Sequence, residues 1–233
     1  MKKTTQRIQQ LTFIALFCAL AYMCAEILPI KVMFLTLDFK DAISVICGFF
    51  FGPLAGLFCA VAVPFVEFIT NPDTGVYGLI MNLLSSVAFV SVSAVIYKYK
   101  KTIFGAVLGL FSAIFSVVAV MMLANMLITP YYMHITVDQV IEYIPKLFLP
   151  FNTVKAVLNA SIAMLLYKPI STLLKKTGAM RSRSVSDGEQ TSAGASSKMR
   201  SILVAIMSCV VIALALFVIF KVLGGQIDFK REI

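Results

Sequence analysis

The sequence has few charges, a single histidine and no tryptophan. Only 13% of its 233 residues are charged, whereas a soluble domain carries about a quarter. The one histidine, His134, argues against a metal site or a protease dyad built on histidine within this chain. The sequence also lacks the motifs H-E-x-x-H, G-x-S-x-G and G-x-x-x-x-G-K-[ST]. These absences disfavour an enzyme, and ATP-driven work would need an ATPase on another chain.

Cysteine is present but not in a form that suggests disulfides or metal ligands. None of the five cysteines belongs to a C-x-x-C pair, and all lie within apolar runs: Cys18, Cys24, Cys47, Cys59 and Cys209. Cysteines in such positions usually serve as small packing residues.

What the sequence has in abundance is apolar residues, which make up 60% of it, with a mean hydropathy of +0.95. Runs long enough to cross a bilayer predict a multi-span, all-α membrane protein. The first run could pass for a signal peptide, but it continues past a possible cleavage site at 19–21 to Leu28, so we expect a retained helix. Clear spans are expected at 11–28, 78–97, 103–128, 146–168 and 201–223.

The apolar stretch 42–69 is long for one span and short for two, and the distribution of basic residues decides between them. Two short helices broken at Gly52 and Pro53 place residues 1–10, 98–101 and 168–200 on one side, with 13 of the 20 Lys and Arg residues. Lys and Arg concentrate in cytoplasmic segments, so this arrangement predicts six helices plus a seventh. The N-terminus would be cytoplasmic, and the C-terminus external.

A change in composition divides the chain. Residues 177–200 are rich in Ser, Gly and Ala, and they predict a flexible cytoplasmic linker. We expect a six-helix membrane domain at 1–176 and an extra helix with a short tail at 201–233. Gly48, Gly52 and Gly56, spaced by four, predict close packing of two helices around the break, by either helix association or a tight turn.

The segment LPFNTVKAVLNA (149–160) places Asn152, Lys155 and Asn159 on one stripe of a helix. With the helix starting near Lys146, Lys155 lies roughly 13 Å deep at ~1.5 Å per residue. A lysine at the centre of a membrane helix costs about 2.5–3.5 kcal/mol even on the lenient insertion scale. It could pair with a buried carboxylate or with carbonyls at the kink of Pro150, but a lysine that faces a ligand is the preferred hypothesis. Asn159, one turn deeper, is expected to matter less for the ligand.

Other helices add amides at similar depth. Asn82 and Asn125 fall in the outer halves of their spans, and each could simply form an interhelical hydrogen bond. Together with Asn152, however, amides from three helices predict a cavity open to the outside. The loop 34–42 leads into the second helix: Asp38 or Asp41 could cap it, and Thr36, Leu37 and Lys40 could form a lid. Glu26 and Glu67 lie near the outer interface and are assigned no role.

These motifs carry a family resemblance. LTLDFKDAISVICGFFFGPLAGL (35–57) followed by LPFNTVKAVLNA resembles the substrate-binding S component of energy-coupling factor (ECF) vitamin transporters, most closely the riboflavin-specific branch. The resemblance covers roughly residues 8 to 176. It implies a six-helix component that binds its vitamin from outside and works with a transmembrane coupling subunit and two ATPase subunits. The linker and the seventh helix have no counterpart in that pattern.

The resemblance also implies site residues. Its docking motif A-x-x-x-A on the first helix matches Ala15 and Ala19, although Ala21 and Ala25 repeat the spacing. The flavin contacts that it implies fall on these positions: Asn152, Lys155, Asn125, Asn82, Gly78, Thr36, Leu37 and Lys40.

The ligand chemistry is compatible with riboflavin. One edge of the flat isoalloxazine ring alternates donors and acceptors, which suits amides and an ammonium, and the ribityl hydroxyls suit a polar loop. No resident cofactor is expected: riboflavin would be cargo, and ATP would be used by the partner subunits. The same residues would also suit another heteroaromatic vitamin, and a membrane scaffold that uses buried polar groups between helices stays an alternative. We expect a multi-pass protein of the cell membrane that binds no nucleic acid.

Overall fold

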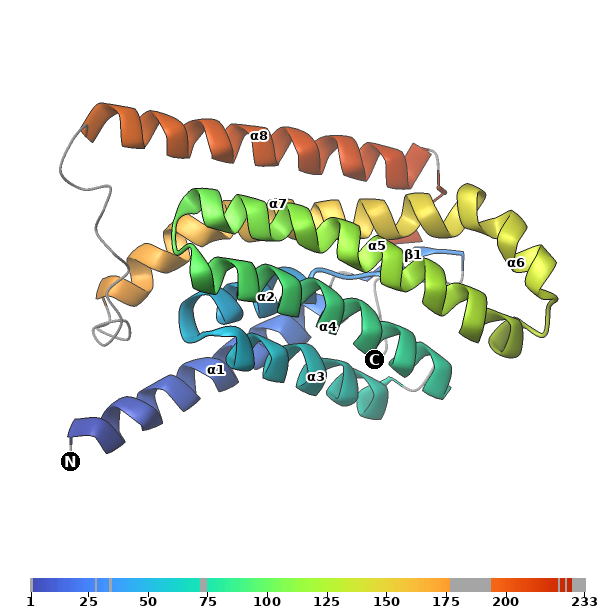
Figure 1. Ribbon diagram of the computed structural model, residues 1–233, viewed down its shortest axis with the longest axis horizontal. Helices are drawn as coiled ribbons and strands as arrows, with labels where there is room; N and C mark the ends of the chain where they lie inside the picture. The colour runs from blue at the N-terminus through green and yellow to red at the C-terminus, as the bar shows by residue number, and fades with distance from the viewer. Residues whose placement is uncertain are drawn as a thin grey trace.

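The protein is a bundle of long helices with a small sheet at one end (Figure 1). The computed structural model describes residues 2–27, 29–33, 35–71, 75–176, 194–221, 223–224 and 226–227. The long helices are α1 (Lys2–Ile27), α2 (Lys40–Phe51), α3 (Pro53–Thr70), α4 (Gly75–Tyr99), α5 (Ile103–Met133), α7 (Leu149–Lys176) and α8 (Gly194–Lys221). Helix α6 (Val137–Tyr143) and the π-helical segment η2 (Ile144–Phe148) lead into α7.

Among the described residues, six helical segments are long and apolar enough to cross a membrane: α1, α3, α4, α5, α6 with α7, and α8. Helix α2 has only 12 residues, about 18 Å at the rise of an α-helix, so it is too short to span alone. Almost all of α2 is buried inside the bundle instead. The predicted membrane bundle with an extra C-terminal helix is confirmed.

The predicted break at Gly52 and Pro53 separates α2 from α3. Gly52 has a φ of 102°, a conformation that favours glycine, and Pro53 starts α3. The two helices return on each other closely, because a Cβ atom on Gly56 would lie 2.7 Å from the Cα of Gly48. The chain therefore needs glycine on both sides of this turn, as the glycine ladder predicted.

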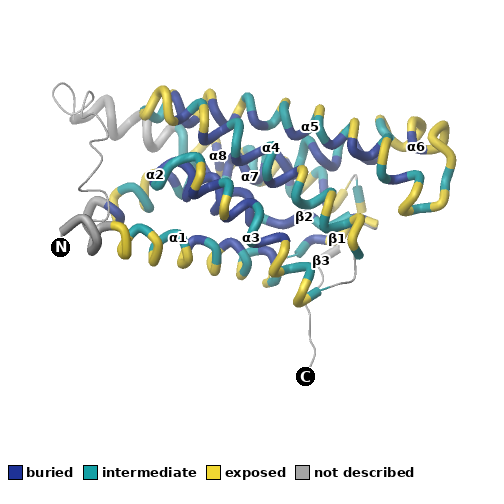
Figure 2. Tube along the Cα trace, turned by 60° about the horizontal axis from the view of Figure 1, so that its bottom comes forward, coloured by how far each residue is buried: buried dark blue, intermediate teal, exposed yellow. Residues whose placement is uncertain are grey.

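The outer surface of the bundle is apolar. Large side chains such as Leu11, Phe104, Phe115 and Leu127 are more than half exposed, while the interior is buried (Figure 2). A soluble monomer rarely exposes that much contiguous apolar surface, whereas a bilayer covers it. The exposure agrees with several membrane-crossing helices.

The segment predicted as a simple loop between the first two helices forms a β-hairpin. Strand β1 (Ile30–Val32) pairs antiparallel with β2 (Leu35–Leu37), and β3 (Gln226–Ile227) pairs antiparallel with the other edge of β1. The sheet order is therefore β2-β1-β3. This sheet was not expected from the sequence, because its strands have only two or three residues each.

The extra helix α8 packs along α7, and it lies across the bundle from α1, which packs on α2 and α3 (Figure 1). It begins at Gly194, before the expected start at 201. The part of the expected linker at 177–193 lies outside the described residues, so the division of the chain into a domain, a linker and a tail stays a prediction.

Candidate functional site

A cavity of about 410 Å³ opens at one end of the bundle. The end of α1, the β-hairpin, the end of α3, the start of α4, the end of α5 and the start of α7 meet there because successive spans alternate in direction. The volume lies within the range of about 300–1,000 Å³ that small-molecule sites occupy. Apolar walls include Met81, Met121, Ile128 and Phe151.

Seven of the eight predicted binding residues line this cavity: Thr36, Lys40, Gly78, Asn82, Asn125, Asn152 and Lys155. They come from the hairpin and from four different helices, so residues up to 119 positions apart in the sequence share one space. Leu37 does not line it. Its side chain is fully buried in a separate apolar cluster, which also contains Val140 and Phe148.

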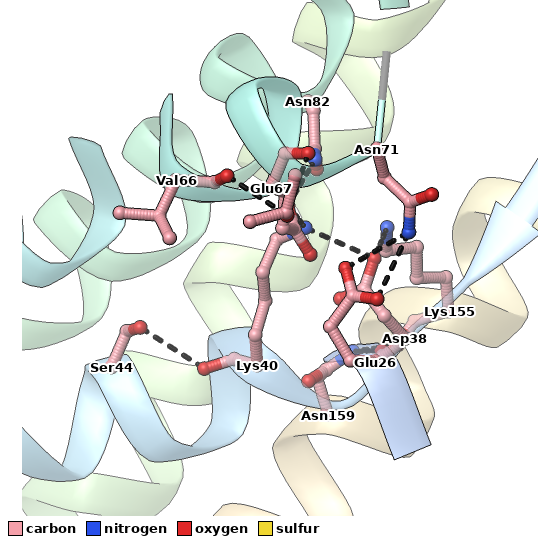
Figure 3. A network of polar contacts seen from close by, with 11 residues as sticks. Glu26, Asp38, Lys40, Ser44, Val66, Glu67, Asn71, Asn82, Lys155 and Asn159 are labelled. Atoms are coloured by element: carbon pink, nitrogen blue, oxygen red, sulfur yellow. Dashed lines mark hydrogen bonds and ion pairs between the residues drawn. The ribbon is translucent and has the colours of Figure 1, made fainter. Parts of the chain in front are cut away.

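The polar wall of the cavity contains a chain of buried charges (Figure 3). Lys155 Nζ lies 2.9 Å from Asp38 Oδ2, and Lys40 Nζ lies 3.2 Å from the same oxygen. Lys40 also pairs with Glu67 Oε2 at 2.6 Å, and the Asn82 side-chain amide donates to that oxygen at 2.8 Å. Two ammonium groups and two carboxylates therefore neutralise each other, which lowers the cost of holding them out of water.

Asp38 is the centre of this network. It lies in the short loop between β2 and α2, with its side chain only 6% exposed. Burial alone raises the pKa of the carboxyl group, but the ammonium groups of Lys155 and Lys40 outweigh it and lower the pKa to about 2. The group is therefore ionised at neutral pH. Its Oδ1 is buried without a hydrogen-bond partner among the described residues.

Lys155 combines the two roles that the sequence left open. It pairs with a buried carboxylate, as the structural alternative supposed, and it also lines the cavity, as the ligand hypothesis supposed. The rest of the ammonium group can donate to a ligand, since a lysine has three N–H donors. Asp38 holds the lysine head toward this wall, so the two roles are compatible.

Asn159 fixes the loop that carries Asp38. Its side-chain amide donates to the Asp38 carbonyl at 3.0 Å, and its oxygen accepts from the Ala42 backbone N–H at 2.9 Å. It thereby satisfies an N–H in the first turn of α2, the task suggested for Asp38 or Asp41. The residue preceding α2 is Phe39, and no side-chain cap hydrogen bond is found there. Asn159 does not line the main cavity, so its role is structural.

The amides of the cavity are held in place by their own helices. Asn152 donates to the Phe148 carbonyl at 2.8 Å, and Asn125 donates to the Met121 carbonyl at 2.7 Å and accepts from Thr129 at 3.0 Å. Each amide has two N–H donors and an oxygen with two acceptor positions, so these bonds orient the group without using its full capacity.

Sequence reasoning assigned no role to the two glutamates that the structure brings to the cavity. Glu67 pairs with Lys40 and Asn82, and Glu26 accepts two bonds from the Asn71 amide, at 3.1 and 2.9 Å. Asp38, suggested only as a cap, is the counterion of Lys155. The available signal was charge balance: two lysines predicted at one buried site require carboxylates close by.

The proposed docking alanines face outward. Ala15 and Ala19 on α1 are exposed, whereas Ala21 and Ala25, which repeat their spacing, are buried. Burial thus separates the two pairs that the sequence could not distinguish. Of these four alanines, only Ala15 and Ala19 are accessible to another chain.

Comparisons with known proteins agree with a ligand-binding membrane component. A family model described as the substrate-specific component of ECF transporters matches residues 9–171. The chain is 26% identical over 184 residues to the riboflavin transporter RibU of Staphylococcus aureus (strain TCH60), covering 75% of this chain and 97% of that protein. A solved structure, of the S component of a bacterial ECF transporter, aligns with a TM-score of 0.63 and 25% identity, covering 72% of this chain and 99% of that chain.

The apolar helices and the ligand-sized cavity define a membrane protein that binds small molecules. The chain belongs to the family of ECF transporter substrate-specific components. It is a homologue of a riboflavin transporter, and members of this family bind substrates for transport rather than act as enzymes. The family match ends at residue 171, so α8 and β3 lie outside it.

Proposed function

We propose that this protein captures riboflavin from outside the cell and delivers it through a separate coupling subunit that is driven by two ATPase subunits. The observation that carries the proposal is the cavity wall itself. Asn125, Asn152 and Lys155 present amide and ammonium groups within a partly apolar space. This combination suits a flat ring with a polar edge. The relative of S. aureus, described as a riboflavin transporter, supports the choice of ligand.

The hairpin supplies the second half of the proposed site. Thr36 and Lys31 line the cavity from β2 and β1, where they face each other as cross-strand partners. Polar side chains at the mouth suit a ribityl chain, whose hydroxyl groups both donate and accept hydrogen bonds. In this arrangement the isoalloxazine ring lies toward α5 and α7, and the ribityl chain lies under the hairpin.

The distribution of charge supports an external opening. Lys98, Lys100, Lys101 and Lys168 lie at the ends of α4 and α7 and the start of α5, opposite to the cavity. Basic residues favour the cytoplasmic side, so the cavity would face outward and the N-terminus inward. Residues 1–176 would then form the binding domain, and the linker that leads to α8 would be cytoplasmic and end near Gly194.

The surface of α1 supports docking to the coupling subunit. Ala15 and Ala19 leave room for close approach of a partner helix, because small residues allow backbones to meet. Helix α8 packs on α7 across the bundle, so it leaves this face of α1 open (Figure 1). The extra helix is therefore compatible with a standard docking site. ATP would be bound by the partner subunits and not by this chain.

The test is riboflavin binding by the purified protein. We expect yellow, fluorescent ligand to be retained on purification, and the ligand-free protein to quench riboflavin fluorescence on titration. Thiamine and biotin added in excess should not compete. A colourless protein that shows no riboflavin titration, or one that prefers another vitamin in the same assay, would contradict the proposed substrate and leave the family intact.

A further inference from the structure

We propose that the C-terminal appendage, α8 with β3, is a positioning element of the ligand cavity that holds the β-hairpin closed over it. The inference rests on the proposed function for the identity of the ligand. Its structural part, the restraint of the hairpin, stands on contacts that involve no ligand. The appendage lies outside the region matched by the family model, which ends at residue 171.

The first observation is the pleat of the hairpin. Side chains on a strand alternate between its two faces. The cross-strand partners Lys31 and Thr36 both line the cavity, whereas the next partners along the ladder, Ile30 and Leu37, are buried in the apolar cluster. The hairpin is thus a wall between two environments: Lys31 and Thr36 face the cavity, Ile30 and Leu37 face the cluster, and Leu35 at the start of β2 contacts both.

The second observation is what covers the apolar face. Ala215 and Ile219 lie one turn apart on α8, and both belong to the same buried cluster as Ile30, Val32 and Leu37. Ile219 is fully buried and Ala215 is 7% exposed, whereas other apolar side chains of α8, such as Leu214 and Phe217, are exposed. The end of α8 therefore completes the apolar cluster behind the hairpin, to which α7 and η2 also contribute, while α8 itself packs mainly along α7.

The third observation is that the appendage also holds the hairpin through its backbone. β3 pairs with the free edge of β1, with Ile227 opposite Ile30 and Gln226 opposite Lys31. Without β3, β1 and β2 would form an isolated two-stranded hairpin, which is marginally stable in water. The partner strand comes from the far end of the chain, so a small element is anchored to a long packed helix.

These contacts link the appendage to the charge network. β2 ends at Leu37, and Asp38, the counterion of Lys155, follows immediately. Movement of the hairpin away from the bundle would therefore withdraw Asp38 from Lys155 and open the mouth at Lys31 and Thr36. Release of the ligand requires such movement if the hairpin covers it. The appendage makes opening more costly and thereby slows release.

The experiment compares the full chain with a chain that ends at Lys221 and so lacks β3. Hydrogen exchange of the ligand-free proteins measures the restraint directly. Loss of one or two backbone hydrogen bonds is expected to raise exchange of the amides in 30–32 by about tenfold. Exchange in α4 and α5 should stay the same, which shows that the bundle is folded. Equal exchange of the hairpin in both proteins would overturn the proposal.

A matched pair of substitutions tests the packing contribution. Ile219→Ala removes methyl groups from the cluster, whereas Ile206→Ala removes the same atoms from a residue of α8 that is 58% exposed. We expect Ile219→Ala to raise the rate of riboflavin dissociation by about three- to tenfold, and Ile206→Ala to leave it unchanged. Unchanged dissociation from both Ile219→Ala and the shortened chain would overturn the role in ligand retention.

The two proposals fail separately. If the full chain does not bind riboflavin, the proposed function is wrong, and the exchange of residues 30–32 still decides whether the appendage restrains the hairpin. If riboflavin binds but the hairpin exchanges equally with and without β3, the proposed function stands and the restraint is wrong.

Discussion

The two ends of the bundle bury polar groups in different ways. One end, here called the basic end, carries Lys98, Lys100, Lys101 and Lys168 and lies opposite to the cavity. There, Tyr97 and Tyr167 share one hydrogen bond of 2.8 Å between their hydroxyls, inside a cluster of rings that includes Phe49 and Phe50. At the cavity end, Asp38 and Lys155 belong to a network of ion pairs and amides beside an open space. The two tyrosine hydroxyls bond each other inside the packed rings, whereas the network keeps hydrogen-bonding capacity directed into the cavity.

The difference suggests that the basic end mainly stabilises the fold, whereas the cavity end has a further use. Close-packed rings stabilise by burial of apolar area and by their edge and stacking contacts. Buried ion pairs contribute little to stability in comparison with apolar packing, because their desolvation offsets their attraction. A membrane protein that keeps charges at one end therefore has another use for them, and the variants below test whether that use is binding.

Substitutions on the outer face of α1, away from both ends of the bundle, should have the largest effect, and this effect should be on uptake. Ala15→Trp and Ala19→Trp should abolish riboflavin uptake by cells that contain the coupling module, because the added rings prevent close approach of a partner helix. Riboflavin binding by the purified variants should equal that of the parent, since both alanines point away from the cavity. Uptake assays and titrations provide the two readouts.

Leu20→Trp is the control, because Leu20 is also exposed on α1 but on another side of the helix. Its uptake should be close to that of the parent. Loss of binding together with uptake in Ala15→Trp or Ala19→Trp would instead make these alanines internal packing residues.

The second largest effect is expected at the cavity end, where loss of a charge should weaken riboflavin binding. Lys155→Met should weaken riboflavin binding at least about tenfold, since loss of a charged hydrogen-bond partner costs about 1.5–3 kcal/mol. The variant should also be less stable than the parent, because Asp38 loses its closer counterion and keeps only Lys40. Titration and thermal unfolding measure the two effects independently. Full affinity in the folded variant would make the lysine purely structural.

The third effect concerns Asn159, which does not line the cavity but holds the loop that carries Asp38. Asn159→Ala should lower the free energy of unfolding by about 1–3 kcal/mol, because the Ala42 N–H and the Asp38 carbonyl lose a buried partner. Riboflavin affinity should fall less than in Lys155→Met, since Asn159 does not line the main cavity.

Thr153→Ala is the comparison for Asn159→Ala on the same helix. Among the described residues, the Thr153 hydroxyl bonds the Leu149 carbonyl of its own helix alone, so its removal should change neither stability nor binding appreciably. A fall in affinity for Asn159→Ala larger than that for Lys155→Met would mean that the ligand extends deeper than the cavity described here.

The smallest effect, a slight loss of stability, is expected from a substitution at the basic end. Tyr97→Phe should lower stability by about 1 kcal/mol, because it removes one partner of a buried hydrogen bond and retains the ring. Riboflavin binding should not change. Tyr99→Phe, at a side chain that is 84% exposed, should change neither property. A clear loss of binding in Tyr97→Phe would show that the two ends are coupled.

Many residues of the cavity could be predicted because polar side chains are rare within the apolar runs of a membrane-spanning sequence. Asn82, Asn125, Asn152 and Lys155 are conspicuous one by one, and the alternating direction of the spans gives them a common depth. Residues whose role depends on a distant partner were not predictable in this way. Asp38 and Glu67 sit in places where an acid is unremarkable, until the fold brings Lys40 and Lys155 beside them.

The β-hairpin could not be predicted from the sequence for a different reason. Short strands carry no reliable periodic signal, so the segment before α2 was expected to be a loop in which Thr36, Leu37 and Lys40 could form a lid. Pairing with β1 imposes an alternation that turns Leu37 away from the cavity while Thr36 faces it. β3 was also unpredictable, because two residues at the far end of the chain acquire their partner only in the folded protein.

Under the proposed function, the charges at the cavity end bind the ligand and do not merely stabilise the fold. The most direct test is riboflavin titration of the double variant Asp38→Asn/Lys155→Met, which removes the buried ion pair as a unit and leaves Lys40 with Glu67. We expect this variant to unfold at a temperature close to that of the parent, because both charges are removed together. It should bind riboflavin at least about tenfold more weakly. If the double variant is folded and binds riboflavin as tightly as the parent, these charges are not part of the ligand site.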